Sequence, residues 1–162
     1  MSTSLPIQFR EYIPSSDTNF ILKTYLRGGK LGVFGKTVPD ILWFNGAADM
    51  CLNHLLKSEK VILAVDINYP SLIFGFLIYN KIDNVFVSHF VYVKEAFRSI
   101  GIAKALYAEA GHDIKNPNIS GITTYKHANI SPLHGFHNLI YNPLLLCKGV
   151  NEPSKDAGDS NG

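Results

Sequence analysis

The chain has 162 residues, of which 46% are hydrophobic, so it is long enough for one domain with a substantial core. Its formal net charge of +2 is too small to indicate a nucleic-acid partner by overall electrostatics, although a local basic patch is compatible with it. The N-terminus lacks a basic region followed by an apolar stretch, and no apolar run approaches the roughly 20 residues of a membrane span. We therefore expect a soluble, cytoplasmic protein.

The first third of the chain predicts one strand followed by two helices. Alternation of apolar and polar residues around Ile7 and Phe9 indicates the strand. Ser15, Ser16 and Asp17 offer capping oxygens for a first helix, which should end at Gly28-Gly29. Thr37 should cap the second helix, whose buried face is expected to hold the apolar residues that recur every three or four positions: Ile41, Phe44, Ala48, Leu52 and Leu55.

Two features of this region allow more than one interpretation. Trp43 lies off the predicted apolar stripe and is expected to fill the edge of the core or to line a groove. The glycine-rich stretch Gly28–Gly35 is expected to be a solvated loop or a substrate flap. It is not a phosphate-binding P-loop, because no Gly-Lys-Ser/Thr ends it.

The pattern then changes to that of strands. Val61–Val65, Leu72–Tyr79 and Val85–Val93 read as strands, and the last two should pair antiparallel across a loop at Asn80–Asn84. The remaining predicted elements are a helix and two strands: Ile102–His112, Gly121–Tyr125 and Ile140–Leu146. Exposure of the last strand would allow a homodimer. Residues 1–150 should form the domain and the polar stretch 151–162 a disordered tail.

One junction between a strand and a helix carries recognisable chemistry. A strand ending at Val93 leads through the loop Arg98–Ala103 into a helix N-terminus. Such a junction aims several backbone N–H groups and the positive end of the helix dipole at one point, which favours a phosphate or pyrophosphate. Gly101 allows a close backbone approach, and Arg98 can add a charge-assisted hydrogen bond.

This junction resembles the central motif of the GNAT superfamily of N-acetyltransferases, Arg/Gln-x-x-Gly-x-Gly/Ala. The motif stands here as Arg98, Ser99, Ile100, Gly101, Ile102 and Ala103, and Val93 matches the end of the family's fourth strand. The match to the family's pattern can be made residue by residue over about Val85–Ala110. The rest of the chain is similar to GNAT-like proteins of phage and prophage genomes. The resemblance implies an α/β (α+β) GNAT fold: a central, mixed and mostly antiparallel twisted sheet with helices on both faces.

The resemblance also implies acetyl-coenzyme A as cosubstrate, with direct attack of an amine on its thioester. The pyrophosphate would lie on the motif, and the pantetheine arm would bond to the backbone of Phe90, Val91, Tyr92 and Val93. One N–H of that strand would polarise the thioester carbonyl. Many family members carry a glutamate base on this strand, but that position falls near Val87 here. His89 is our candidate base, with a buried, hydrogen-bonded histidine as the alternative.

The family's usual tyrosine acid lies in a segment where this sequence departs from the pattern, because Pro132 and Gly135 interrupt any helix. Tyr125 and Tyr141 are the candidate acids, and three nearby histidines are further possibilities: His127, His134 and His137. No cysteine or acidic residue accompanies these histidines, so we expect no metal site. The two cysteines, Cys51 and Cys147, are expected to be reduced thiols.

We therefore expect an N-acyltransferase that acetylates an amine on a protein or a small molecule. Two other functions remain open. One is modification of a nucleic-acid base, as in GNAT-like phage Mom proteins. The other is a catalytically silent GNAT fold that binds a host protein, which the missing glutamate favours. The acceptor itself cannot be read from the sequence.

Overall fold

A computed structural model of the chain describes residues 4–127 and 138–146. Six strands form one sheet in the order β1-β2-β3-β4-β5-β6. The first three pairs of neighbours are antiparallel, whereas β4 with β5 and β5 with β6 are parallel. The strand bounds are Ile7–Glu11 for β1, Lys60–Asp66 for β2, Ile73–Ile82 for β3, Val85–Val93 for β4, Gly121–Thr123 for β5 and Leu139–Tyr141 for β6.

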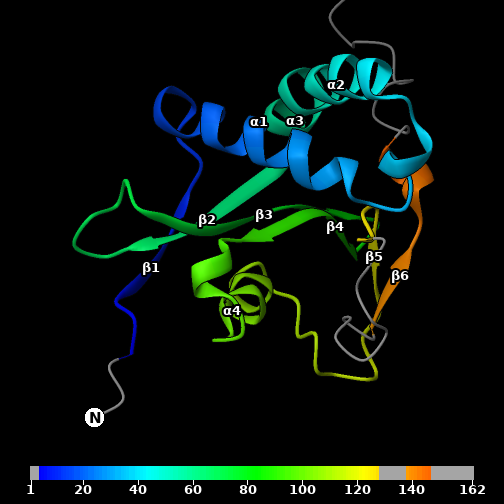
Figure 1. Cartoon of the computed structure of the whole chain (residues 1–162). Helices are drawn as coiled ribbons and strands as arrows, with labels where there is room; N and C mark the ends of the chain where they lie inside the picture. Colours follow the sequence, from blue (N-terminus) through cyan, green and yellow to red (C-terminus); the bar gives the residue numbers. More distant parts are fainter. Residues whose placement is uncertain (1–3, 128–137, 147–162) are drawn as a thin grey trace, which may run out of the picture.

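Helices cover both faces of the sheet (Figure 1). On one face lie α1, Pro14–Lys30, and α2, Asp40–Asp49, which continues through one π-helical segment, Met50–Leu55, into α3, Leu56–Ser58. On the other face lies α4, Ile102–Glu109. The predicted fold class, a mixed and mostly antiparallel sheet between helices, is therefore confirmed. No helix in the described part of the chain is long and apolar enough to cross a membrane.

The hairpin between β3 and β4 is confirmed, with a tighter turn than predicted. Only Asp83 and Asn84 lie between the strands, and both have a positive φ, 50° and 64°. Two consecutive left-handed residues are typical of the type I′ turn, whose twist matches that of the paired strands. The longest antiparallel contact of the sheet is thus closed by the two residues of the loop that best tolerate this conformation.

The predicted buried face of α2 and the π-helical segment after it is wrong except at Leu55. The buried residues recur at every fourth position, at Trp43, Ala47, Cys51 and Leu55, whereas Ile41 is 73% exposed. Apolar residues occur on two sides of this helix, so periodicity alone does not determine which side faces the sheet. The indole of Trp43 decides it, because its Nε1 donates to Leu26 O of α1 at 2.9 Å.

Several predicted boundaries also differ, including the following three. The helix α1 runs past Gly28-Gly29 to Lys30. Thr37 does not cap α2; its hydroxyl donates to Phe34 O at 2.7 Å, and the N-cap position is Pro39. The strand expected over Ile140–Leu146 is β6 followed by a 3₁₀ turn, because Pro143 has no N–H to give to a ladder. The predicted tail at 151–162 lies outside the described residues.

Candidate active site

A β-bulge in β4 determines which side chains reach the site. Ile78 of β3 is paired with Phe90, but the next residue, Tyr79, is paired with Ser88, so His89 is the extra residue. Without a bulge, neighbouring side chains point to opposite faces of a sheet. With it, His89 lines a cavity on the α1–α2 side and Phe90 packs in the hydrophobic cluster of the same side. Both are almost fully buried.

The strand β4 separates from β5 just beyond this bulge. Val87 and Ser88 are paired with β5, and Thr124 N donates to Ser88 O at 2.9 Å. From His89 to Val93, the described residues show pairing of β4 with β3 alone. The second half of β4 therefore presents an open backbone edge.

The alternation of backbone groups identifies the residues at this open edge. Lys94 N donates to Phe74 O of β3, and a Cβ on Gly75 of β3 would lie 2.4 Å from Tyr92 O, so Tyr92 and Lys94 face β3. The residues between them face the other way, and Val93 O accepts a hydrogen bond from Arg98 Nε at 2.9 Å. Of the predicted pantetheine-binding residues, Val91 and Val93 have their backbone groups on the open edge.

The motif Arg98–Ala103 lies at the end of that edge. Gly101 is the N-cap residue of α4 and has φ 91°, in the left-handed region. No side chain caps the helix, so the first backbone N–H groups of α4 have no side-chain acceptor. A Cβ on Gly101 would meet nothing within 4 Å, which leaves open space above the turn. These features are those of an anion-binding helix N-terminus.

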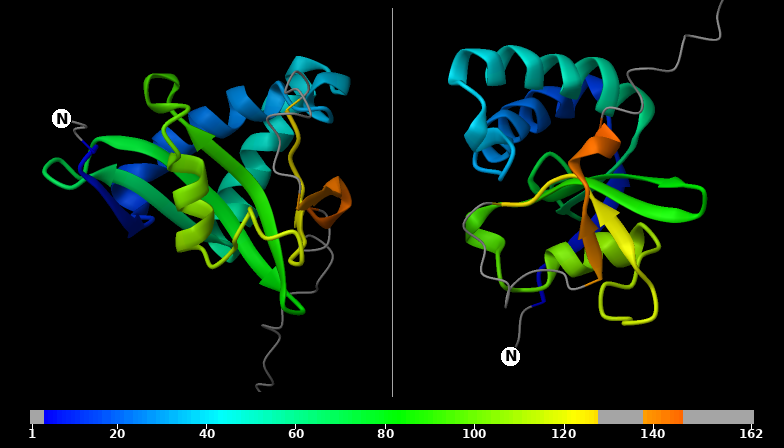
Figure 2. Two further views of the ribbon diagram at one scale, coloured as in Figure 1. Left: turned by 90° about the horizontal axis from the view of Figure 1, so that it is seen from below. Right: turned by 90° about the vertical axis from the view of Figure 1, so that its right-hand side faces the viewer.

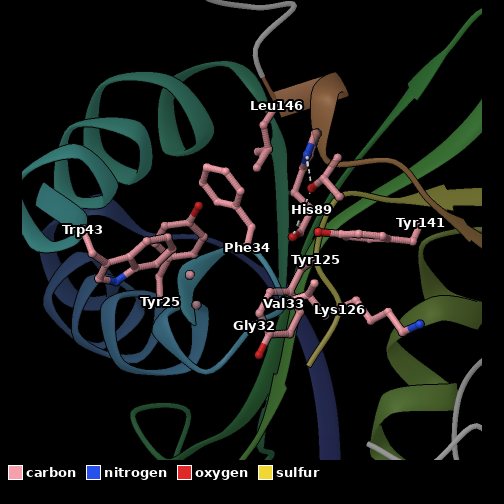
Figure 3. A pocket seen from close by; sticks show the side chains of 13 residues that line it. Tyr25, Gly32, Val33, Phe34, Trp43, His89, Tyr125, Lys126, Tyr141 and Leu146 are labelled. Atoms are coloured by element: carbon pink, nitrogen blue, oxygen red, sulfur yellow. Dashed lines mark hydrogen bonds between the residues drawn. The ribbon is translucent and has the colours of Figure 1, made fainter. Parts of the chain in front are cut away.

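The three candidate catalytic residues line one cavity of about 30 Å³, enough for about one water molecule. Figure 3 shows His89, Tyr125 and Tyr141 around it, with Tyr25, Phe34, Trp43 and Leu146 on its apolar side. The charged side chain in this lining is Lys126. The sequence predicted these three residues separately, and the fold brings them together from β4, the end of β5, and β6.

His89 has polar contacts at both ring nitrogens. Its Nδ1 lies 3.1 Å from the hydroxyl of Thr124, which is itself buried. Its Nε2 lies 3.4 Å from Glu59 Oε2, an ion-pair distance longer than an ordinary hydrogen bond. Burial raises the pKa of Glu59, but hydrogen bonds and the charge of its neighbours, His89 first, outweigh this and hold the pKa below its usual value. Glu59 is therefore ionised near neutral pH.

The two candidate tyrosines, Tyr125 and Tyr141, differ in the hydrogen bonding and burial of their side chains. Tyr125 donates its hydroxyl to Gly28 O at 2.8 Å, and burial raises its pKa to about 12. Tyr141 is half-buried, and burial raises its pKa as well. Among the further candidates, His127 forms a bridge with Gly32. His134 and His137 lie outside the described residues, among which no group of three metal-ligating side chains occurs.

The glycine-rich stretch Gly28–Gly35 packs against the site. A Cβ on Gly28 would come within 2.7 Å of the Phe90 ring, and one on Gly32 within 2.7 Å of the Tyr125 ring. Val33 N also donates to Lys126 O at 2.8 Å. The expectation of a solvated loop is thus confirmed only for Leu31, Val33 and Phe34, which are exposed. The glycines of the stretch allow the end of α1 to lie directly on the site.

Sequence reasoning missed Thr124 and Glu59. Thr124 lies within the strand predicted over Gly121–Tyr125, in which Tyr125 alone was predicted to be catalytic. Glu59 lies before β2, and no motif marks it. The signal that was available is a lone carboxylate immediately before an apolar strand, which is too common to single out a site.

Comparisons with known proteins concern the fold. No protein-family model matches the sequence, and no curated protein matches it. Solved structures do match. PaiA N-acetyltransferase from Thermoplasma acidophilum, in complex with coenzyme A, is 17% identical over 65% of this chain and 69% of that chain, with a TM-score of 0.49.

Two other acetyltransferase structures are similar to the same degree. A possible acetyltransferase from Clostridium difficile 630 is 19% identical over 96% of both chains, with a TM-score of 0.47. A putative acetyltransferase of the GNAT family from Desulfovibrio desulfuricans is 15% identical over 67% of this chain and 66% of that chain, with a TM-score of 0.44. With identities of 15–19% and TM-scores of 0.44–0.49, these matches are likenesses from which no family follows for this chain.

Proposed function

We propose that the chain is an acetyl-coenzyme A-dependent N-acyltransferase that acetylates an amine. The observation that carries the proposal is the open edge of β4, which leads from the helix N-terminus at Gly101 to the cavity at His89. A thioester cosubstrate with a pyrophosphate at one end and a reacting carbonyl at the other requires an anion site and a reaction site joined by hydrogen-bonding backbone.

The cosubstrate would be held by backbone groups more than by side chains. Its pyrophosphate would lie on the first N–H groups of α4, Ile102 and Ala103 among them, with the guanidinium of Arg98 donating its remaining N–H groups to a phosphate oxygen. The pantetheine amides would bond to Val91 and Val93. Of these, Val91 lies nearer the bulge, so its N–H is our candidate for polarising the thioester carbonyl.

The cavity favours the reactive form of the acceptor. An amine with a pKa of about 10.4 is almost entirely protonated at pH 7, and the neutral form is the nucleophile. A mostly apolar lining disfavours the ammonium form, because burial lowers an amine's pKa. His89 then provides a place for the proton that leaves the amine.

The leaving thiolate needs a hydrogen-bond donor more than a strong acid. A thiol has a pKa of about 8.5, well below that of a buried phenol, so a tyrosine stabilises the thiolate by donating a hydrogen bond without transferring its proton completely. The hydroxyl of Tyr125 already donates to Gly28 O, whereas Tyr141 is half-buried beside the same cavity. We therefore assign this role to Tyr141.

Calorimetric titration of acetyl-coenzyme A into the purified chain tests the proposal. We expect micromolar binding that is lost in the double variant Arg98→Glu, Gly101→Glu, which places two carboxylates where the pyrophosphate would lie. Arg27→Glu, at a position on α1, is the matched control and should bind as the wild type does. A folded wild type that does not bind would refute the proposal and favour a binding module that has the fold without the reaction.

A further inference from the structure

Thr124, His89 and Glu59 form a continuous row of polar groups inside an otherwise apolar region. The Thr124 hydroxyl lies 3.1 Å from His89 Nδ1, and His89 Nε2 lies 3.4 Å from Glu59 Oε2. The side chains of His89 and Glu59 are 3% and 16% exposed. Thr124 and His89 line the cavity, and Glu59 is the member of the row that reaches solvent.

The chemistry of the three groups determines where the protons lie. An ionised carboxylate is an acceptor only, so the imidazole nitrogen that faces Glu59 must carry a hydrogen. In a neutral imidazole the other nitrogen is then an acceptor. The Thr124 hydroxyl lies 3.1 Å from Nδ1 and 3.4 Å from His89 O, so Nδ1 is the nearer acceptor for its hydrogen. The Thr124 oxygen keeps its lone pairs for a donor in the cavity. The hydroxyl hydrogen of Thr124 and the Nε2 hydrogen of His89 therefore both point away from the cavity, in the direction of Glu59.

We propose that this row takes up the proton of the attacking amine, with Thr124 as the group that touches the amine. The proposal rests on the proposed function. As the N–C bond forms and the C–S bond breaks, the amine gives one proton to Thr124 Oγ1, and the Thr124 hydroxyl proton passes to His89 Nδ1. His89 becomes an imidazolium, whose charge Glu59 balances. After the products leave, Nδ1 returns the proton through Thr124 to water in the cavity, which restores the Nε2–H form. Glu59 is a positioning residue, because it acts through His89.

Other titratable groups around His89 do not replace this route. Tyr25 of α1 and Tyr125 after β5 are buried phenols whose pKa values are raised, so both are neutral near pH 7. Tyr141 of β6 has a raised pKa too, and Lys126 is a cation. Glu59 is thus the acidic group placed next to the imidazole.

A pair of substitutions at Thr124 separates the relay from packing. Thr124→Ser keeps the hydroxyl and Thr124→Val keeps the shape. Using release of free coenzyme A with an amine acceptor as the assay, we expect Thr124→Val to lower kcat by roughly 100-fold and Thr124→Ser by less than about 10-fold. The KM for acetyl-coenzyme A should change by less than about 2-fold in both. Equal activity of the two variants would overturn the proposal, as would an acetyl group found covalently on Thr124 by mass spectrometry.

The role of Glu59 has a signature in the pH profile. We expect Glu59→Gln to lower kcat by about 10-fold and to move the acid limb of the profile to lower pH, since the carboxylate favours the protonated imidazole. Glu59→Asp should keep the wild-type profile. Glu11→Gln, a change of an exposed carboxylate on β1, should alter neither. A loss of kcat in Glu59→Gln with an unmoved acid limb would reduce Glu59 to a structural role.

A measurement without turnover keeps the two proposals separate. In protein labelled with ¹⁵N-histidine, long-range proton–nitrogen spectra report which ring nitrogen carries the hydrogen. We expect the Nε2–H form for His89 at neutral pH, and the Nδ1–H form would overturn the relay. Coenzyme A binding together with the Nδ1–H form would leave the proposed function intact and remove the relay. Absence of binding would remove both, since no acetyl transfer would remain to be served.

Discussion

Gly101 offers a test of the loop on which the donor site depends. Its φ of 91° is one that L-residues avoid, and a Cβ added there would meet nothing within 4 Å. An alanine is therefore penalised through its backbone alone, by about 1–2 kcal/mol. We expect Gly101→Ala to lower the free energy of unfolding by this amount, measured by urea denaturation. Gly101→Asn should cost less, because asparagine enters the left-handed region more easily.

Gly75 is the matched control, because a side chain there would be disfavoured by steric crowding and not by the backbone conformation. Its backbone is in an ordinary region, but a Cβ would lie 2.4 Å from Tyr92 O and 3.2 Å from Val93 Cα. Backbone atoms in a paired strand cannot easily move away, so Gly75→Ala should cost roughly 1–3 kcal/mol through overpacking. Asparagine there should be no better than alanine. If Gly101→Ala unfolds at the same urea concentration as the wild type, the left-handed turn is absent and the reasoning about the anion site fails with it.

Three further perturbations follow from buried contacts. Burial raises the pKa of Asp17, but the Arg10 guanidinium at 2.7 Å and other hydrogen bonds hold it below its usual value. Asp17→Asn should therefore lower the free energy of unfolding by roughly 1.5–3 kcal/mol at pH 7. This difference should shrink as the pH falls through and below 4, where the carboxylate is protonated. Phe90→Ala should cost about 3–5 kcal/mol in urea denaturation, since its ring packs on three aromatic rings. Tyr125→Phe removes a hydrogen bond to Gly28 O and should cost about 1 kcal/mol by thermal unfolding, with coenzyme A affinity unchanged.

Local signals predicted much of the architecture because they depend on neighbouring residues. The turn at Asp83-Asn84 and the left-handed Gly101 are examples, since their residue types fit the backbone that the structure has. The prediction of which side of α2 is buried was wrong for the opposite reason. Its apolar residues are found on two sides, and the hydrogen bond of Trp43 to α1 is a tertiary contact that periodicity does not contain.

The site was predictable in parts but not as a whole. His89, Tyr125 and Tyr141 were chosen one by one, and their meeting depends on the register of three strands. Glu59 and Thr124 lie 30 and 35 positions from His89 along the chain. Glu59 approaches it through the pairing of β2 with β3 and β3 with β4, and Thr124 through the parallel pairing of β4 with β5, which no short sequence pattern encodes.

The bulge at His89 explains how one strand serves both the core and the site. Phe90 has to face α1, where Tyr25 packs against its ring at 5.3 Å, and strict alternation would then turn the residue before it toward α4. One extra residue removes this conflict, because His89 reaches the cavity on the same side as Phe90. The same residue lies where β4 leaves β5. A single irregularity thus places the imidazole at the inner end of the open edge, which is where a thioester held along that edge would meet an amine.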